Sequence, residues 1–277
     1  MGAALSDQQF IEVEGAALRV RSAGQGPAIV LIHGWALDLE MWRDQIELLS
    51  PRYRVIAFDR RGFGLSSGEP DIEQDVLDID RVLARFEIER AAVVGMSQGA
   101  RVALRWALKH PERAACLVLD GPPADGMSPP PGGDEIPLED YRERARRDGI
   151  DAFKRQWLLH PFMQLQTKAS GAQQLLREMA IRYPARDLLL EQRPPHSPLR
   201  GCDLQRLLVP TLILSGEYDS QQRRSIARQL TQALPNARLK TVVGAGHLAV
   251  LDDPGTYSAI LRDFISSQRA LAAGAVI

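Results

Sequence analysis

Short apolar runs alternate with amphipathic stretches over most of the chain. Eight short segments have the apolar content or the polar–apolar alternation of strands. They cover residues 10–14, 18–21, 28–32, 55–58, 91–94, 114–119, 211–214 and 238–243. Five longer stretches repeat apolar residues at helical spacing. These cover residues 39–50, 72–86, 98–109, 221–233 and 254–268. The order predicts an α/β fold with a mostly parallel, twisted sheet of about eight strands, helices on both faces and an antiparallel opening hairpin.

One region interrupts this order. From residue 121 to residue 137 the chain is rich in proline and glycine, which excludes regular structure there. Residues 138–192 then have helical patterns without a buried strand. We therefore predict a helical cap that is inserted over one end of the sheet. The predicted division is a core domain of residues 1–123 and 201–277 and a cap of residues 124–200.

Composition and charge exclude several classes of function. The 277 residues, 45% of them hydrophobic, suffice for one large core and an insertion. The 34 basic and 35 acidic residues give a formal net charge of -1, so neither nucleic acid nor an anionic membrane is an expected partner. No secretory signal pattern and no run of 18 apolar residues is present, so we expect a cytoplasmic protein without a membrane span.

A candidate nucleophile lies between a predicted strand and a predicted helix. Residues 95–99, Gly-Met-Ser-Gln-Gly, match the G-x-S-x-G pattern. That pattern holds a serine on a sharp turn, with glycines where side chains would meet neighbouring backbone. The pentapeptide alone is a weak signal, because the chain contains 22 glycines. The buried strand before it and the amphipathic helix after it make Ser97 the predicted nucleophile.

A serine nucleophile needs a general base. The chain contains five histidines. Of these, His247 follows the last predicted strand, at the end of the sheet where loops converge. The remaining histidines fit polar or structural roles better, and they are His33, His110, His160 and His196. We therefore predict His247 as the base.

The base in turn needs an acid that orients it. Asp219 follows the predicted strand 211–214, and the order Ser97, Asp219, His247 is the chain order of triads on this kind of sheet. Asp120 ends the strand after the nucleophile helix, and Glu217 is close to Asp219 in sequence. Both remain alternatives for the acid.

Acyl transfer also needs donors for a developing oxyanion, which are usually backbone N–H groups. One donor is expected at Gln98, directly after the serine, and its side chain would either reach into the site or cap the helix. The second is expected in the loop after the strand 28–32, where Gly34 allows a tight turn. The N–H of Trp35 is the predicted second donor.

Five motifs resemble those of the α/β-hydrolase superfamily in order and spacing. They are residues 33–35 (His-Gly-Trp), 58–64 (Phe-Asp-Arg-Arg-Gly-Phe-Gly), 95–99, 216–219 (Gly-Glu-Tyr-Asp) and 244–247 (Gly-Ala-Gly-His). The first half of the chain most resembles the bacterial arylesterase and cofactor-free haloperoxidase branch and the enol-lactonases. The resemblance covers about residues 10–122 and 203–268. It implies a triad and two backbone donors, without a metal or an organic cofactor. The triad would be Ser97, Asp219 and His247, and the donors would be Trp35 and Gln98.

The same resemblance assigns a structural role to residues 59–64. Asp59 is expected to pair locally, with Gly62 and Gly64 permitting the bend. His33 is likewise expected to hold its loop by hydrogen bonds. A serine at position 97 argues against haloalkane dehalogenases and epoxide hydrolases, which use an aspartate nucleophile there.

The predicted cap carries apolar side chains that are candidates for binding substrate. The predicted substrate-binding residues are Trp157, Phe162 and Met163, and Leu158 and Tyr183 are further lining candidates. The cap also carries arginines whose helical spacing fits a solvated face. They are Arg142, Arg144, Arg146, Arg147 and Arg155.

The predicted function is hydrolysis of a small to medium carboxylic ester or lactone through an acyl-enzyme on Ser97. Two alternatives use the same triad, namely hydrolysis of a carbon–carbon bond and perhydrolysis. A third is a ligand receptor on a hydrolase scaffold. The sequence predicts no oligomeric state.

Overall fold

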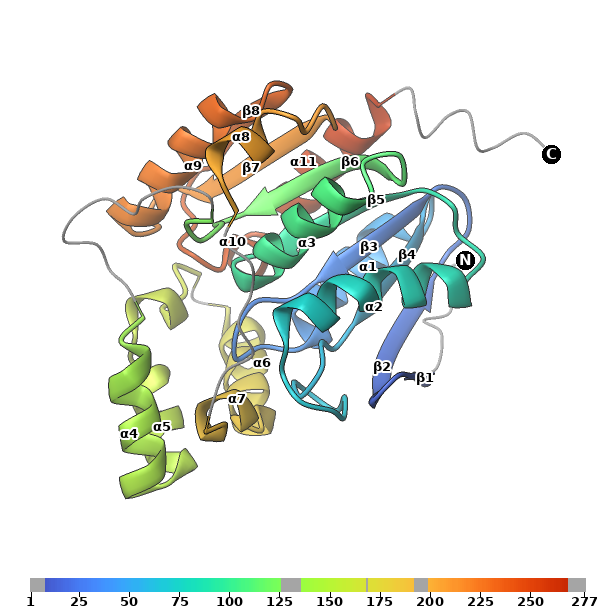
Figure 1. The fold of residues 1–277 in the computed structure, drawn as a ribbon. Coiled ribbons are helices and arrows are strands. Elements are labelled where there is room, and N and C mark those ends of the chain that lie inside the picture. Colours follow the sequence, from blue (N-terminus) through green and yellow to red (C-terminus); the bar gives the residue numbers. More distant parts are fainter. Residues whose placement is uncertain (1–7, 126–135, 168, 192–198, 269–277) are drawn as a thin grey trace.

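A computed structural model describes residues 8–125, 136–167, 169–191 and 199–268 (Figure 1). Within these residues, eight strands form one sheet in the order β1-β2-β4-β3-β5-β6-β7-β8. The strands are β1 (Gln9–Val13), β2 (Ala16–Ala23), β3 (Ala28–Ile32), β4 (Arg54–Phe58), β5 (Ala91–Met96), β6 (Ala114–Asp120), β7 (Thr211–Gly216) and β8 (Ala237–Val242). β2 runs antiparallel to β1 and β4, and every other neighbouring pair is parallel. The predicted sheet and its opening hairpin are confirmed.

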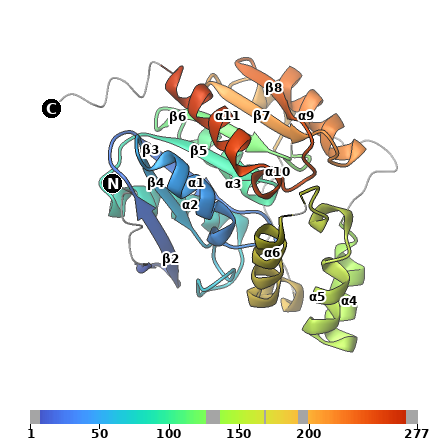
Figure 2. The same cartoon turned by 180° about the vertical axis from the view of Figure 1, so that it is seen from behind.

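The helices cover both faces of the sheet. α1 (Arg43–Leu49) and α11 (Pro254–Ser266) lie on one face (Figure 2). The other face carries α2 (Ile72–Arg85), α3 (Gln98–Lys109) and α9 (Gln221–Ala233). Two shorter helices in the core, α8 (Gly201–Leu204) and α10 (Ala249–Asp252), lie in connecting segments.

The apolar sequence of the central strands accounts for their burial on both faces of the sheet. All five residues of β3 are buried. Ile29 and Leu31 belong to the apolar cluster under α1 and α11, whereas Val30 and Ile32 belong to the cluster under α2 and α3. Because successive side chains of a strand point to opposite faces, an unbroken apolar run is the pattern that a strand with two covered faces requires.

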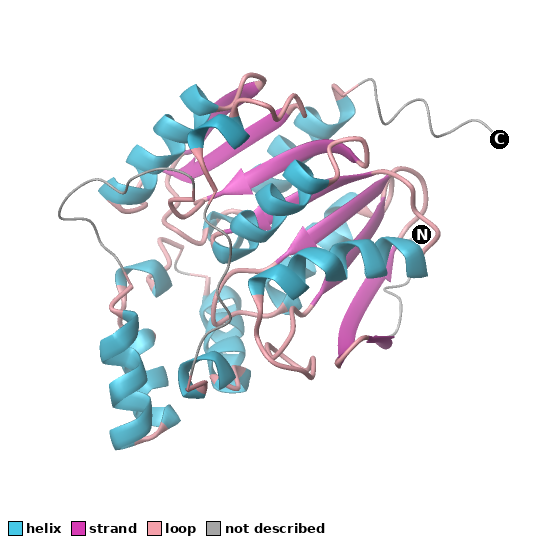
Figure 3. Cartoon of the chain, viewed as in Figure 1, coloured by secondary structure: helices cyan, strands magenta, loops and turns pink. Residues whose placement is uncertain are grey.

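The cap region is helical where it is described. Its elements are α4 (Leu138–Asp148), α5 (Ile150–Trp157), η2 (Pro161–Met163), α6 (Ser170–Arg182) and α7 (Arg186–Leu189). They lie beyond the carboxyl ends of the parallel strands, and the cap shows only helices and loops among its described residues (Figure 3). The division into domains stays a prediction. Within the proline-rich stretch, residues 126–135 lie outside the described residues, as does His196.

One predicted helix has a different start. Residues 39–50 contain a 3₁₀ turn, η1 (Leu39–Trp42), before α1 begins at Arg43. The Asp38 side chain accepts a hydrogen bond from the Glu40 N–H at 2.9 Å and caps this tight turn. Among the described helices, none is long and apolar enough to cross a membrane.

Candidate active site

Ser97 occupies a strained turn between β5 and α3. Its φ is +50°, in the left-handed region that a residue with a side chain adopts at a cost. A Cβ on Gly95 would lie 2.3 Å from the Gly99 carbonyl oxygen, and one on Gly99 would lie 2.3 Å from the Ile32 carbonyl oxygen. The Ser97 N–H donates to the Asp120 carbonyl over 2.7 Å. The two glycines of the motif are therefore required by close backbone contact.

His247 and Asp219 form a buried pair. The His247 Nδ1 lies 3.0 Å from each carboxyl oxygen of Asp219, and the two residues are 5% and 3% exposed. A carboxylate can only accept, so Nδ1 carries the proton and Nε2 keeps a free lone pair. Gly121 makes room for the imidazole, because a Cβ there would lie 2.9 Å from His247 Cε1.

The two alternative acids, Glu217 and Asp120, are not the partners of the His247 imidazole. Glu217 accepts a hydrogen bond from the Gly244 N–H over 2.8 Å and so holds the loop before His247. Asp120 is 1% exposed, and burial raises the pKa of its carboxyl to about 8, with the nearby charge of Asp219 adding to the rise and the Tyr257 hydroxyl opposing it. With a pKa of about 8, the Asp120 carboxyl is mostly protonated at pH 7. Among these three described acids, Asp219 is the one bonded to His247.

The loop after β3 is held by His33. The His33 Nε2 accepts from the Arg60 N–H over 2.9 Å, so its Nδ1 carries the proton and donates to the Gly34 carbonyl over 2.8 Å. Burial, and next the Arg60 charge, lower the pKa of His33 well below its ordinary value. The Gly34–Trp35 peptide is trans, so its N–H points opposite to its carbonyl. His33 thus directs the Trp35 N–H away from itself.

The N–H groups of Trp35 and Gln98 have no acceptor among the described residues. Gln98 opens α3, where the first backbone N–H groups lack a partner within the helix. Its side chain takes neither of the two expected positions, because Gln98 Oε1 accepts from Arg60 Nη2 over 2.5 Å.

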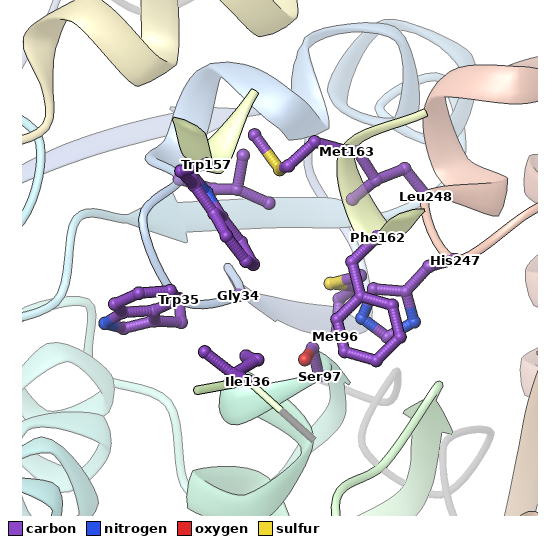
Figure 4. Close-up of a pocket in the computed structure, with 11 residues that line it drawn as sticks. Gly34, Trp35, Met96, Ser97, Ile136, Trp157, Phe162, Met163, His247 and Leu248 are labelled. Carbon is purple, nitrogen blue, oxygen red and sulfur yellow. The ribbon is translucent and has the colours of Figure 1, made fainter. Parts of the chain in front are cut away.

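One pocket brings Ser97, His247 and Trp35 together. It encloses about 260 Å³ of empty space, including its open mouth. Its lining residues are Gly34, Trp35, Leu37, Met96, Ser97, Ile136, Trp157, Phe162, Met163, His247 and Leu248. Figure 4 shows the Ser97 hydroxyl facing this space, with the Phe162 ring over His247 and the Trp157 ring across from them. Most of the lining is apolar.

Three of the five cap candidates line the pocket, namely Trp157, Phe162 and Met163. The Phe162 ring stacks on the His247 imidazole, with centroids 4.1 Å apart and planes 25° apart. Tyr183 is absent from the described lining, because its ring stacks on Phe63 and its hydroxyl donates to Asp187. Leu158 is also absent from it and packs against the apolar cluster.

One expectation for the cap arginines was wrong. Arg142 is buried, and its Nη2 donates to the Leu190 carbonyl. Helical spacing shows which residues share a face of α4. It does not show that the end of α7, at Leu190, packs against the face that carries Arg142. The other four arginines are at least partly exposed.

The motif at 59–64 has the expected structural role. The Asp59 carboxyl accepts from the N–H groups of Leu39 and Leu65 at 2.7 and 2.8 Å and pairs with Arg19 at 3.0 Å. A Cβ on Gly64 would lie 2.1 Å from Asp59 Oδ2.

Sequence reasoning missed some lining residues. Met96 and Leu248 are the chain neighbours of Ser97 and His247, so adjacency to the motifs was an available signal. Leu37 and Ile136 had no such signal. Ile136 lies at the end of the proline-rich segment, in a stretch where no regular pattern places a side chain.

Comparison with known proteins identifies the family. A family model described as "alpha/beta hydrolase fold" matches residues 27–254. A pimeloyl-[acyl-carrier protein] methyl ester esterase of Nitrosomonas europaea is 30% identical over 86% of this chain and 96% of its own. A putative non-heme chloroperoxidase of a Synechocystis species is 28% identical over 81% and 86%. The enol-lactonase of Burkholderia xenovorans superposes with a TM-score of 0.75 at 22% identity, covering 94% of this chain and 100% of its own. The chain belongs to the alpha/beta hydrolase fold family.

Proposed function

We propose that this chain is a serine hydrolase that cleaves a small to medium carboxylic ester or lactone through an acyl-enzyme on Ser97. The observation that carries the proposal is the Asp219–His247 pair. His247 Nδ1 lies 3.0 Å from the Asp219 carboxyl, and His247 lines the same pocket as the strained Ser97. A nucleophile, a base and an orienting acid are the parts that acyl transfer by a serine requires.

We propose a role for each group. His247 Nε2 takes the proton of the Ser97 hydroxyl while Oγ bonds to the carbonyl carbon of the substrate. Asp219 holds the Nδ1–H and stabilises the imidazolium that forms. The N–H groups of Trp35 and Gln98 donate to the oxyanion. The imidazolium then protonates the leaving alkoxide, and His247 next removes a proton from the water that releases the acid.

The pocket limits the acyl group. The empty space of about 260 Å³ includes the open mouth, so the enclosed part that could hold an acyl group is smaller. The apolar lining supports an alkyl or aryl chain with one reactive carbonyl. The relatives named as an ester hydrolase and an enol-lactonase support the same substrate class.

A panel of substrates tests this proposal. It contains p-nitrophenyl esters of two to eight carbons, γ-lactones, a β-diketone and acetate with hydrogen peroxide. We expect hydrolysis of the short esters or the lactones, and loss of that activity in Ser97→Ala. Turnover of the diketone alone would instead support carbon–carbon hydrolysis, and peracid formation without ester hydrolysis would support perhydrolysis. Tight binding of a panel compound without turnover would favour a receptor.

A further inference from the structure

A carboxyl group of the cap reaches the indole of Trp35. The Trp35 Nε1–H donates to Asp187 Oδ2 over 2.6 Å, and the Tyr183 hydroxyl donates to Asp187 Oδ1. Asp187 and Trp35 are each 7% exposed. A hydrogen bond to a carboxylate is about twice as strong as one between neutral groups. The contact therefore holds the indole firmly, although Asp187 is 152 residues away in the chain.

The rest of the indole packs against the cap as well. Its ring centroid lies 4.7 Å from that of Trp157, 5.9 Å from Tyr183 and 6.0 Å from Phe153. All three rings belong to cap elements or their ends. The Trp35 side chain is therefore embedded in the cap, whereas its backbone belongs to the loop beside Ser97.

That backbone needs support. The next residue, Ala36, has a φ of +58°, a strained value for a residue with a side chain. Strained conformations persist where surrounding contacts hold them. His33 holds the Gly34 carbonyl on one side of the loop. The Trp35 indole holds the other side through Asp187.

The other predicted donor, the N–H of Gln98, belongs to a residue that is held differently. Gln98 Oε1 accepts from Arg60 Nη2 over 2.5 Å, and Arg60 pairs with Asp75 at 2.9 Å. Arg60 and Asp75 are 0% and 1% exposed, and both belong to the core. This anchor contains no cap residue.

We propose that Asp187 is a positioning residue for the oxyanion hole: by anchoring the Trp35 indole in the cap, it directs the Trp35 N–H toward the oxygen that becomes negative. The inference rests on the proposed function, since it assigns Trp35 to that hole. One proposed oxyanion donor is thus held by the core alone, and the other by the core and the cap together. Breaking the anchor should lower kcat and leave KM nearly unchanged, because the oxyanion exists only near the transition state.

The test compares four variants on one short p-nitrophenyl ester. We expect Asp187→Ala to lower kcat about tenfold, less than the roughly hundredfold loss of a whole donor, with KM within about twofold. Asp187→Asn keeps an oxygen that accepts from the indole, so it should stay within about threefold of wild type. Trp35→Phe keeps the backbone N–H but loses the indole donor, and it should match Asp187→Ala. The double variant Asp187→Ala/Trp35→Phe should lose no more kcat than either single variant.

Arg182→Ala is the matched control. Arg182 pairs with Asp38 at 2.9 Å, joining cap and core, and its pair does not include Trp35. We expect this variant to keep kcat within about twofold. Thermal melts report whether each variant folds. If Asp187→Ala does not fold, Asp187→Asn and Trp35→Phe still decide the question.

Several outcomes would overturn the inference. They are an unchanged kcat in Trp35→Phe, a loss in Asp187→Asn as large as in Asp187→Ala, additive losses in the double variant, or an equal loss in Arg182→Ala. A change confined to KM would also overturn it. If wild-type Ser97 neither hydrolyses esters nor reacts with a fluorophosphonate, the proposed function fails and this inference with it. A reactive wild type with an unaffected Asp187→Ala removes the inference alone.

Discussion

Two loops meet at the pocket, and they are fixed by different parts of the molecule. The turn around Ser97 is set by backbone contacts inside the core, at Gly95 and Gly99. The loop around Trp35 is set by side chains, with His33 on the core side and Asp187 on the cap side. The first loop does not depend on the cap, whereas the second is complete only with the cap in contact.

This difference separates two aspects of catalysis. The proposed nucleophile and base lie in turns at the carboxyl ends of the strands. Half of the proposed oxyanion hole is instead coupled to the element that also lines the substrate pocket. Variation in the cap can therefore change the catalytic rate as well as the choice of substrate.

The largest effect is expected on the core side, at Asp219. Asp219→Asn replaces the acceptor that keeps the proton on His247 Nδ1, which favours the wrong tautomer. We expect kcat for a short ester to fall by roughly 10³- to 10⁴-fold, with the fold intact by circular dichroism. Glu217→Gln is the matched control and should stay near wild type. A greater loss in the control than in Asp219→Asn would assign the acid to Glu217.

The backbone contact at the turn is tested next. In Gly99→Ala the new Cβ would lie 2.3 Å from the Ile32 carbonyl oxygen. We expect a loss of stability of roughly 3 kcal/mol and a large loss of activity, because the turn must shift. Gly171→Ala is the control, since nothing lies within 4 Å of its Cβ position in α6. A Gly99→Ala protein with wild-type melting temperature and activity would show that the turn is not fixed by this contact.

A smaller effect is expected at Phe162, where the cap contacts His247. The centroid of the Phe162 ring lies 4.1 Å from that of the His247 imidazole. The Arg223 guanidinium lies 5.1 Å from the same Phe162 centroid. Phe162→Leu keeps an apolar side chain but loses the stacking. We expect KM to rise several-fold, with kcat changed about threefold or less. Steady-state kinetics measures both, and a large fall of kcat at constant KM would mean that the cap also positions the base.

The smallest effect on activity is expected at Asp120, which contributes its main-chain carbonyl to the turn. Asp120 is mostly protonated at pH 7, so Asn resembles it, and kcat should change about twofold or less. A loss comparable with that of Asp219→Asn would make Asp120 the orienting acid.

The raised pKa of Asp120 should also make the stability of the fold depend on pH. The folded protein keeps the Asp120 proton up to about pH 8, whereas the unfolded chain releases it near the ordinary value of 3.8. Folding therefore takes up a proton between these values, and stability falls as pH rises across that window. We expect the melting temperature of Asp120→Asn relative to wild type to rise between pH 5 and pH 8. A difference that does not change with pH would contradict the raised pKa.

The core could be predicted because the burial and close contacts of each element determine which residues occupy neighbouring positions in the sequence. A strand with both faces covered needs an apolar run, and helix 221–233 was predicted with the bounds that α9 has. The turn around Ser97 leaves its mark in two glycines, because only glycine fits those contacts. The Asp219–His247 pair follows from the two loops at the carboxyl ends of β7 and β8.

The cap contacts could not be predicted in the same way. Asp187 meets Trp35 across 152 positions, and nothing in the residues around either one indicates the other. Arg142 shares a helix face with other arginines, yet it is buried because the Leu190 carbonyl lies against it. Such contacts depend on how helices pack together, which periodicity does not report. The hydrogen bond from Arg60 to the Gln98 side chain was likewise not predicted, because the motif that contains Arg60 was interpreted only as a bend.

The central claim is that Ser97 is activated by His247 and Asp219. Intact-protein mass after treatment with a fluorophosphonate, followed by peptide mapping, tests it most directly. We expect one adduct per chain, on Ser97, which is absent in Ser97→Ala and forms far more slowly in Asp219→Asn. A folded wild-type protein whose mass stays unchanged, or whose adduct maps to another residue, would contradict it.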